Sequence, residues 1–332
     1  MEERHPHHHS FFWPIILVGV GVIWLLRNLG IIPMFSLGSI IQFWPLLLIV
    51  LGLDILFSRR FPWIGSVVGL LAVAAVVAYL VTGPKLGLES SGAASTDTYS
   101  EPVGSTETVK YVFDTSSSPV DVSALDANDD NLILANITHR GTMRFDVTGS
   151  ENKTVRMSES YQDTGWLYWD FSFDHLKWDI ALNPDVPTEF EINGGSGSID
   201  VDLRGIQLTD FSGDFGSGSS DIKLPETDDA YTADIESGSG SVTLDLPEET
   251  SLTMTLDTGS GSTSVNVPSD AALRIEVMDD GSGSLSLPDG LRKSSDSSSF
   301  SIGAWQTDNY DDADVQILIK ILGQGSGSIS IH

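Results

Sequence analysis

A short motif that recurs at a nearly constant spacing constrains the fold of most of this chain. Gly-Ser-Gly-Ser begins at six positions, with successive spacings of 21, 22, 21, 22 and 44: Gly195, Gly216, Gly238, Gly259, Gly281 and Gly325. Because the last spacing is twice 22, we interpret Gly303 as the skipped position of an unbroken register. A period of this length is typical of proteins that stack one small structural unit on the next.

Every repeat has the same internal order. An alternating apolar run such as Val242, Leu244 and Leu246 follows the motif, a proline ends it in three of the repeats, and a second alternating run such as 252–256 comes next. Alternation with a period of two places the apolar side chains on one face of a strand. We therefore predict that residues 106–332 form an all-β domain, a β-solenoid or roll. Each rung would span about 21–22 residues, a length typical of solenoid repeats, and would contain two strands and two turns.

The glycines of the motif have a structural explanation. Corners that stack at about 4.8 Å leave little room for a Cβ atom. A phosphate-binding loop would need a lysine after the turn, and a calcium β-roll would need an aspartate where Ile199 stands. The motif therefore predicts stacking, and we expect neither a cofactor nor a metal at it.

Three apolar blocks, 11–32, 40–57 and 61–83, precede the repeats. A bilayer core of about 30 Å takes roughly 20 helical residues, so each block with its flanks is long enough to span. Three blocks in tandem exceed what a cleavable signal contains. We predict an N-terminal tail at 1–10, a transmembrane region of three helices at 11–85 and a Ser- and Gly-rich linker at 86–105.

The first two apolar blocks are copies of each other. Phe-Trp-Pro followed by aliphatic residues occurs at 12–17 and again at 43–48, an offset of 31 that also makes Gly21 and Gly52 equivalent. We predict that these two glycines lie where membrane helices pack. The neighbours of the helices are then membrane lipid and any membrane protein partner.

Basic residues predict the orientation. With the N-terminus inside the cell, three arginines lie on the cytoplasmic side and only Arg27 and Lys85 lie outside. Three spans then place the β-domain outside the cytoplasmic membrane, in a multi-pass protein. If the first two blocks instead form one re-entrant hairpin, the β-domain lies inside.

The charge belongs to the repeat domain. The chain has a net charge of -29, but residues 1–85 hold 5 basic and 3 acidic side chains (+2), which leaves 12 basic and 43 acidic (-31) for residues 86–332. Such a domain repels phosphate, which excludes nucleic acid as a partner. The absence of cysteine excludes disulfides, thiolate metal sites and thiol nucleophiles.

Residues 165–182 are crowded with aromatic side chains. Alternation would expose Trp166 and Tyr168, which could contact the sugar rings of a cell-wall polymer. The alternative is a strand that covers the open end of the stack. Acidic clusters such as 126–130 lack the pattern of a calcium loop and fit solvated loops better. No constellation of residues indicates catalysis, so we predict that the protein is not an enzyme.

Two groups of residues resemble one bacterial family. The duplicated Phe-Trp-Pro blocks with Arg-Asn-Leu-Gly-Ile-Ile at 27–32 resemble the membrane region shared by LiaI and LiaF proteins. Trp-Asp-Ile-Ala-Leu-Asn-Pro at 178–184, Gly-Gly-Ser-Gly at 194–197 and Asp-Leu at 202–203 resemble the soluble half of LiaF-like cell-wall-active antibiotic response proteins, whose β-fold is called a toast rack. The Gly-Ser-Gly rungs are also similar to bacterial adhesin-type domains.

This resemblance implies a non-enzymatic envelope protein that senses cell-envelope stress or restrains a membrane sensor kinase. A surface adhesin or cell-wall-binding module is the alternative. The chain departs from the family in the regularity of its Gly-Ser repeat and in having three predicted spans where the family has four.

Overall fold

The computed structural model describes Gly21, Leu71, Ala74 and residues 94–160, 176–279, 281–293 and 302–332. The chain divides into two units, Met1–Ala93 with Asp163–Asp174, and Ala94–Gln162 with His175–His332. In the first unit the three described residues are helical and exposed. Within the described residues, no helix combines the length and the apolar content that a membrane crossing requires. Most of the predicted transmembrane region lies outside the described residues.

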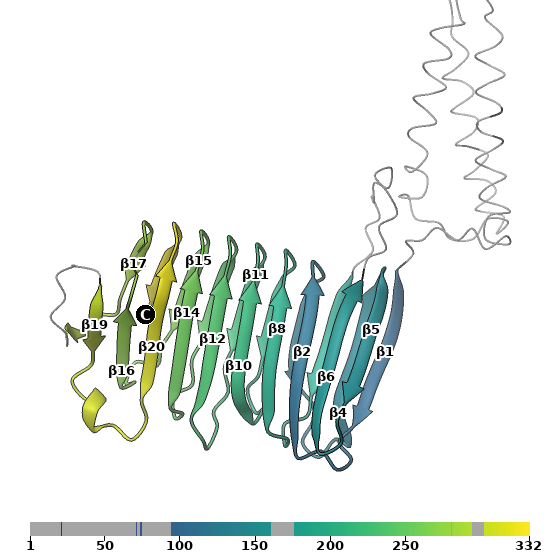
Figure 1. The fold of residues 1–332 in the computed structure, drawn as a ribbon, viewed down its shortest axis with the longest axis horizontal. Helices are drawn as coiled ribbons and strands as arrows, with labels where there is room; N and C mark the ends of the chain where they lie inside the picture. Colours follow the sequence, from purple (N-terminus) through teal and green to yellow (C-terminus); the bar gives the residue numbers. More distant parts are fainter. Residues whose placement is uncertain are drawn as a thin grey trace, which may run out of the picture. The chain divides into compact units, whose positions relative to one another are not determined.

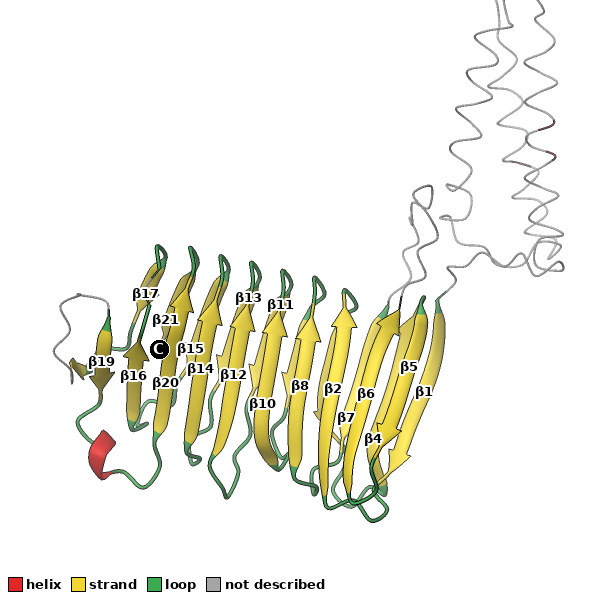
Figure 2. Cartoon of the chain, in the orientation of Figure 1, coloured by secondary structure: helices red, strands yellow, loops and turns green. Residues whose placement is uncertain are grey.

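The second unit is an all-β domain with two large sheets, as predicted (Figures 1 and 2). We call the ten-stranded sheet A and the eleven-stranded sheet B. The strands of sheet A, in spatial order, are β1 (Ser95–Pro102), β4 (Asn131–His139), β7 (Lys177–Leu182), β3 (Val120–Ala124), β9 (Ile199–Asp202), β11 (Ser219–Lys223), β13 (Ser241–Asp245), β15 (Ser262–Asn266), β21 (Ser328–Ile331) and β17 (Ser284–Ser286). The strands of sheet B are β18 (Arg292–Lys293), β19 (Gly303–Gln306), β16 (Leu273–Val277), β20 (Ile317–Gln324), β14 (Leu252–Thr258), β12 (Tyr231–Ser237), β10 (Leu208–Phe215), β8 (Thr188–Gly194), β2 (Thr108–Ser116), β6 (Asn152–Ser160) and β5 (Thr142–Thr148). A short 3-10 helix, η2 (Tyr310–Asp312), precedes β20.

The sequence period is the offset between neighbouring parallel strands. A rung consists of one strand of sheet B and the following strand of sheet A, such as β12 with β13. Tyr231 lies opposite Leu252, and Asp210 lies opposite Thr232, so these pairs reproduce the two short spacings of the Gly-Ser motif. Because the strands are in register, side chains of one type stack in rows, and the fold is solenoid-like.

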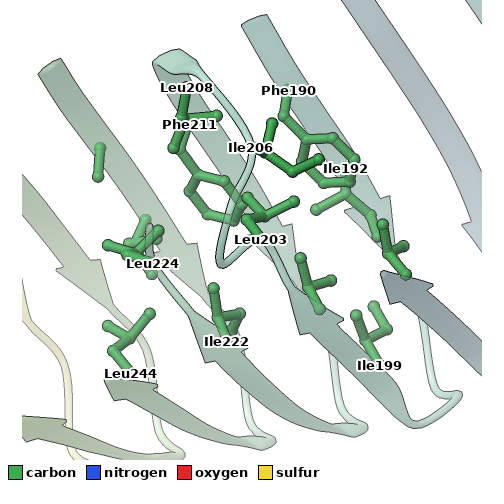
Figure 3. Close-up of a cluster of buried hydrophobic side chains, with 14 of the residues drawn as sticks. Phe190, Ile192, Ile199, Leu203, Ile206, Leu208, Phe211, Ile222, Leu224 and Leu244 are labelled. Carbon is green, nitrogen blue, oxygen red and sulfur yellow. The ribbon is translucent and has the colours of Figure 1, made fainter. Parts of the chain in front are cut away.

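The apolar rows of both sheets form one continuous core. Ile222 and Leu244 occupy the same row on adjacent strands of sheet A, and both are fully buried (Figure 3). Phe190 and Phe211 stack with ring centroids 5.8 Å apart on adjacent strands of sheet B. At roughly 1.5–3 kcal/mol for each buried aliphatic or phenylalanine side chain, these rows are the main source of stability in a domain without cysteine.

The corners of the rungs confirm why the motif contains glycine. Ser241 donates its backbone N–H to the carbonyl oxygen of Gly218 in the preceding corner, at 3.0 Å. A Cβ atom on Gly240 would lie only 2.0 Å from that same oxygen. Stacking of the corners therefore excludes a side chain at this position.

The order of the last rungs differs from the prediction. Gly303 is not a skipped corner, because it begins β19, which pairs antiparallel with β16. The corner at Gly325 instead lies between those of Gly259 and Gly281: Gly325 donates its N–H to Thr258 O at 2.7 Å, and Ser282 donates to Gly325 O at 3.0 Å. The doubled spacing arises because the chain continues past the rung of β16 and β17 and then returns to insert β20 and β21 inside the stack (Figure 1).

Candidate functional site

The end of the domain at which residue 94 enters has its own architecture. The strand β4 pairs antiparallel with both β7 and β1, and β5 pairs antiparallel with β6. Tyr99 of β1 lies against Phe145 of β5, with ring centroids 5.3 Å apart, so the two edge strands meet across the core. We call β1, β4, β5 and β6 the N-terminal cap. The cap ends the parallel stack and covers its first apolar rung.

The first strand corrects the predicted domain boundary. β1 lies within residues 86–105, which we predicted to be a linker. Its composition is polar, and most of its residues are exposed. It forms because all eight residues pair with β4, so tertiary pairing overrides a sequence pattern that is typical of linkers.

Two side-chain contacts from other strands hold β1 in place. Lys153, which is only 9% exposed, extends from sheet B and donates to Glu101 Oε1 at 2.6 Å and to the Pro102 carbonyl oxygen at 2.9 Å. The buried ring of His139 has Nε2 2.9 Å from Asp97 Oδ2. Both β1 carboxylates thus have nitrogen partners on other strands.

A second set of contacts surrounds His139. Its Nδ1 lies 2.8 Å from the carbonyl oxygen of Gly141, so each ring nitrogen has an oxygen partner. Glu159 accepts the backbone N–H of Gly141 at 3.3 Å and the hydroxyl of Ser118 at 2.9 Å. These bonds fix the turn between β4 and β5.

The aromatic segment begins and ends at this same corner. Ser95, the first residue of β1, lies opposite His139, the last residue of β4. Thr138, which precedes His139, lies opposite Lys177, which follows the segment. Ser160, which precedes the segment, lies opposite Thr142 at the start of β5. The strand residues on either side of the aromatic segment, Ser160 and Lys177, therefore pair with the strand ends next to the turn between β4 and β5.

The site residues predicted from the sequence fall mostly outside the described residues. This applies to Trp166, Tyr168 and Gly52. Gly21 is described as helical and exposed. The roles of all four remain predictions.

Acidic side chains form a row on the outer face of sheet A. Asp179, Asp121, Asp200 and Asp221 occupy successive strands in register. Lys177 bridges the first two at 2.5 Å to each, and these hydrogen bonds, that of Asp121 first, raise the pKa of the lysine. The cation offsets the repulsion between carboxylates that lie directly opposite each other.

Two open grooves border the stack. One follows the Gly-Ser corners, whose backbone N–H groups donate to the preceding corner, as Ser262 does to Gly240 O at 3.0 Å. The other follows the opposite turns, where the Glu226 carboxylate accepts the backbone N–H groups of Glu248 at 2.6 Å and Glu249 at 3.0 Å. Within the described ranges, no group of three or more His, Asp or Glu side chains is arranged to hold a metal ion.

Two family models match this chain. The LiaF transmembrane domain matches residues 12–85, and the N-terminal domain of toast_rack matches residues 93–245. The chain thus combines a LiaF-type transmembrane domain with a toast-rack domain. The first match covers the three predicted membrane blocks, so the protein is membrane-associated. The second begins just before β1, which places this strand within the toast-rack domain.

Three solved structures resemble this chain distantly. A candidate cell adhesion protein from Clostridium sporogenes is 16% identical, with 72% of this chain and 98% of that chain covered and a TM-score of 0.49. A candidate adhesin from Bacteroides fragilis is 14% identical, with 72% and 97% covered and a TM-score of 0.32. A candidate lipid-binding protein from Parabacteroides distasonis is 14% identical, with 72% and 98% covered and a TM-score of 0.31. The comparison with curated proteins finds no match.

Proposed function

We propose that this LiaF-like protein is a non-enzymatic, multi-pass protein of the cytoplasmic membrane that senses or regulates cell-envelope stress. Its membrane helices contact a membrane partner such as a sensor kinase, and its toast-rack domain lies outside the membrane. The observation that carries this proposal is the succession of a LiaF transmembrane domain and a toast-rack domain in one chain, with only a short stretch, 86–92, between the two matches.

The N-terminal cap supports a mechanical link between the two parts. β1, the first strand after the predicted membrane region, is attached by pairing with β4 and by Lys153 and His139. We propose that a displacement of the domain is passed to the membrane region through this strand. We propose that Trp166 and Tyr168 contact the partner or a cell-wall polymer.

The membrane contact is tested by photocrosslinking in intact cells. A photoreactive amino acid at Gly21 or Gly52 in the full chain should capture a membrane protein, and the yield should change when a cell-wall antibiotic is added. The control position is Leu71, a helical residue that is 63% exposed. If Gly21 and Gly52 capture no more protein than Leu71 does, with or without antibiotic, the regulatory contact is absent.

Cell-wall binding is the second candidate function. It is favoured by the aromatic segment, whose two ends lie at one corner of the domain. The full chain in lipid nanodiscs should then sediment with purified peptidoglycan, and replacing Trp166 and Tyr168 by alanine should abolish this binding. Equal sedimentation with and without peptidoglycan would exclude this function and leave the regulatory proposal unaffected.

A further inference from the structure

The last rung of the toast-rack domain is out of chain order. We call β20 and β21, residues 317–331, the inserted rung. It lies between the rung of β14 and β15 and the rung of β16 and β17, although it follows both in the sequence (Figure 1). The corner at Gly325 is hydrogen-bonded to the corners on both sides.

The two rungs that flank the inserted rung share one register. Lys320 lies opposite Thr255 on one side and opposite Glu276 on the other. In the same way, Ile319 lies opposite Met254 and Ile275. Removing β20 and moving β16 by one strand spacing would therefore bring Thr255 directly opposite Glu276.

That direct pairing is the one used elsewhere in the stack. Thr255 and Glu276 are separated in the sequence by the same interval as Asp234 and Thr255, which pair directly between β12 and β14. The corners at Gly259 and Gly281 likewise have the same spacing as those at Gly216 and Gly238. The flanking rungs thus carry the spacing for stacking on each other.

Two residues fit the inserted rung to its observed place. Gln324, which is 2% exposed, donates its side-chain amide to Ser284 O of β17 at 2.7 Å. Gly323 leaves space for the Asp257 side chain, whose Oδ1 would lie 2.6 Å from an added Cβ. The positions equivalent to Gly323 in the two preceding rungs hold Asp257 and Glu236, which have acidic side chains. The inserted rung therefore differs in sequence from the regular repeats.

We propose that this end of the domain has two stackings, and that the inserted rung selects between them. In the first, β16 and β17 stack directly on β14 and β15 in chain order. In the second, which is the observed arrangement, the inserted rung lies between them and can be withdrawn. Its withdrawal closes the gap, keeps the rest of the stack in register and releases β20, a strand with three buried isoleucines that would then need another edge to pair with.

Cysteine pairs distinguish the two stackings, because the chain has no cysteine of its own. A disulfide needs Cα atoms within about 7 Å, and strands lie about 4.8 Å apart, so neighbouring strands can be linked and next-nearest strands cannot. In the full chain, Thr255→Cys with Lys320→Cys should cross-link on mild oxidation. Thr255→Cys with Glu276→Cys should not, because β20 lies between them.

Blocking the insertion should reverse this pattern. Ile321 is buried in the inserted rung, and Ile321→Asp places a charge between Leu256 and Val277. In that background the Thr255–Glu276 pair should cross-link in most chains and the Thr255–Lys320 pair should not. A milder variant, Gly323→Val with Gln324→Ala, should produce both cross-links.

A matched variant provides the control. Ile235 is buried in the same row, two strands away, where β10, β12 and β14 already stack in chain order. Ile235→Asp should therefore lower the cooperative unfolding temperature of the domain more than Ile321→Asp does, because the chain-order stacking stays available only to the second variant. If Ile321→Asp abolishes the Thr255–Lys320 cross-link without creating the Thr255–Glu276 cross-link, the chain-order stacking does not exist.

Discussion

Lys153 is the single side chain on which the attachment of β1 depends most. It is almost fully buried and reaches both a carboxylate and a backbone carbonyl of β1. Lys153→Met keeps the apolar stem but leaves Glu101 without its cation, and we expect a loss of about 2 kcal/mol in the free energy of unfolding, the usual range for hydrogen bonds to charged groups. Chemical denaturation of the full chain, followed by far-UV circular dichroism, measures this loss.

Lys110 offers a matched control for Lys153. It also pairs with glutamates, at 3.2 Å to Glu191 and 3.6 Å to Glu189, but its side chain is 43% exposed. Lys110→Met should therefore change stability by less than about 1 kcal/mol. Equal losses in the two variants would show that burial does not strengthen the bridge to β1.

The ionised carboxylate of Asp210 should destabilise the domain at neutral pH, compared with an uncharged side chain of the same shape. Burial raises its pKa, and the neighbouring Asp234 and Glu189 raise it further. The folded state therefore takes up a proton before the unfolded state does, and stability recovers as the pH falls through this raised value. Asp210→Asn should raise the unfolding temperature at about pH 7, and the gain should disappear at about pH 3, where the carboxyl is protonated in both states.

The opposite sign is expected at Asp202. The hydrogen bond from Arg204 lowers the pKa of Asp202, so this carboxylate contributes stability above its unfolded-state pKa and loses it as the pH falls through the lowered value. Asp202→Asn should thus lower the unfolding temperature at neutral pH. Shifts of the same sign in the two variants would contradict this account of the acidic faces.

At the scale of the structural element, the Gly-Ser corner depends on the close approach of one backbone to the next. Gly240→Ala would place its Cβ atom against the carbonyl oxygen of Gly218, and the corner must open to accommodate it. We expect a loss of about 1–3 kcal/mol, as for other overpacked positions. The neighbouring exposed Ser239→Ala should be nearly neutral in the same denaturation experiment, and equal effects would show that the corner is not sterically limited.

The sequence predicts the regular rungs well because each of their strands has a local pattern that indicates a strand. The alternation in 231–256 and the constant glycine spacing are local signals, and they correspond to β12, β13 and β14. β1 was not predicted, because its polar residues have no strand pattern and form a strand only through pairing with β4. The bridge from Lys153 to Glu101 joins positions far apart in the chain, and no local pattern marks such a pair.

The place of the inserted rung could not be predicted for a related reason. Leu252 and Leu273 are separated by the ordinary period, so the sequence favours direct stacking of their strands, yet Ile317 lies between them. Two features of the sequence indicate that this rung is irregular: the doubled spacing before Gly325, and Gly323 and Gln324, which differ from the equivalent residues of the preceding rungs. The position of the aromatic segment relative to the cap also needed the strand pairing, since its sequence alone does not say where its two ends lie.

At the scale of the whole molecule, the charge is divided between two parts with different environments. The membrane region carries +2 and the remainder of the chain carries -31. Acidic rows on the outer faces of the sheets keep a long parallel stack soluble and oppose pairing between molecules. This distribution suits a domain that is held at a membrane and surrounded by water.

The central claim is that the toast-rack domain lies outside the cytoplasmic membrane, and cysteine labelling tests it most directly. Ser260 is exposed at a Gly-Ser corner, and Ser58 lies at the predicted cytoplasmic end of the second membrane block. With a thiol reagent that cannot cross the membrane, Ser260→Cys in the full chain should be labelled in intact cells, and Ser58→Cys only after permeabilisation. Labelling of Ser260→Cys only after permeabilisation would place the domain inside the cell and contradict the account.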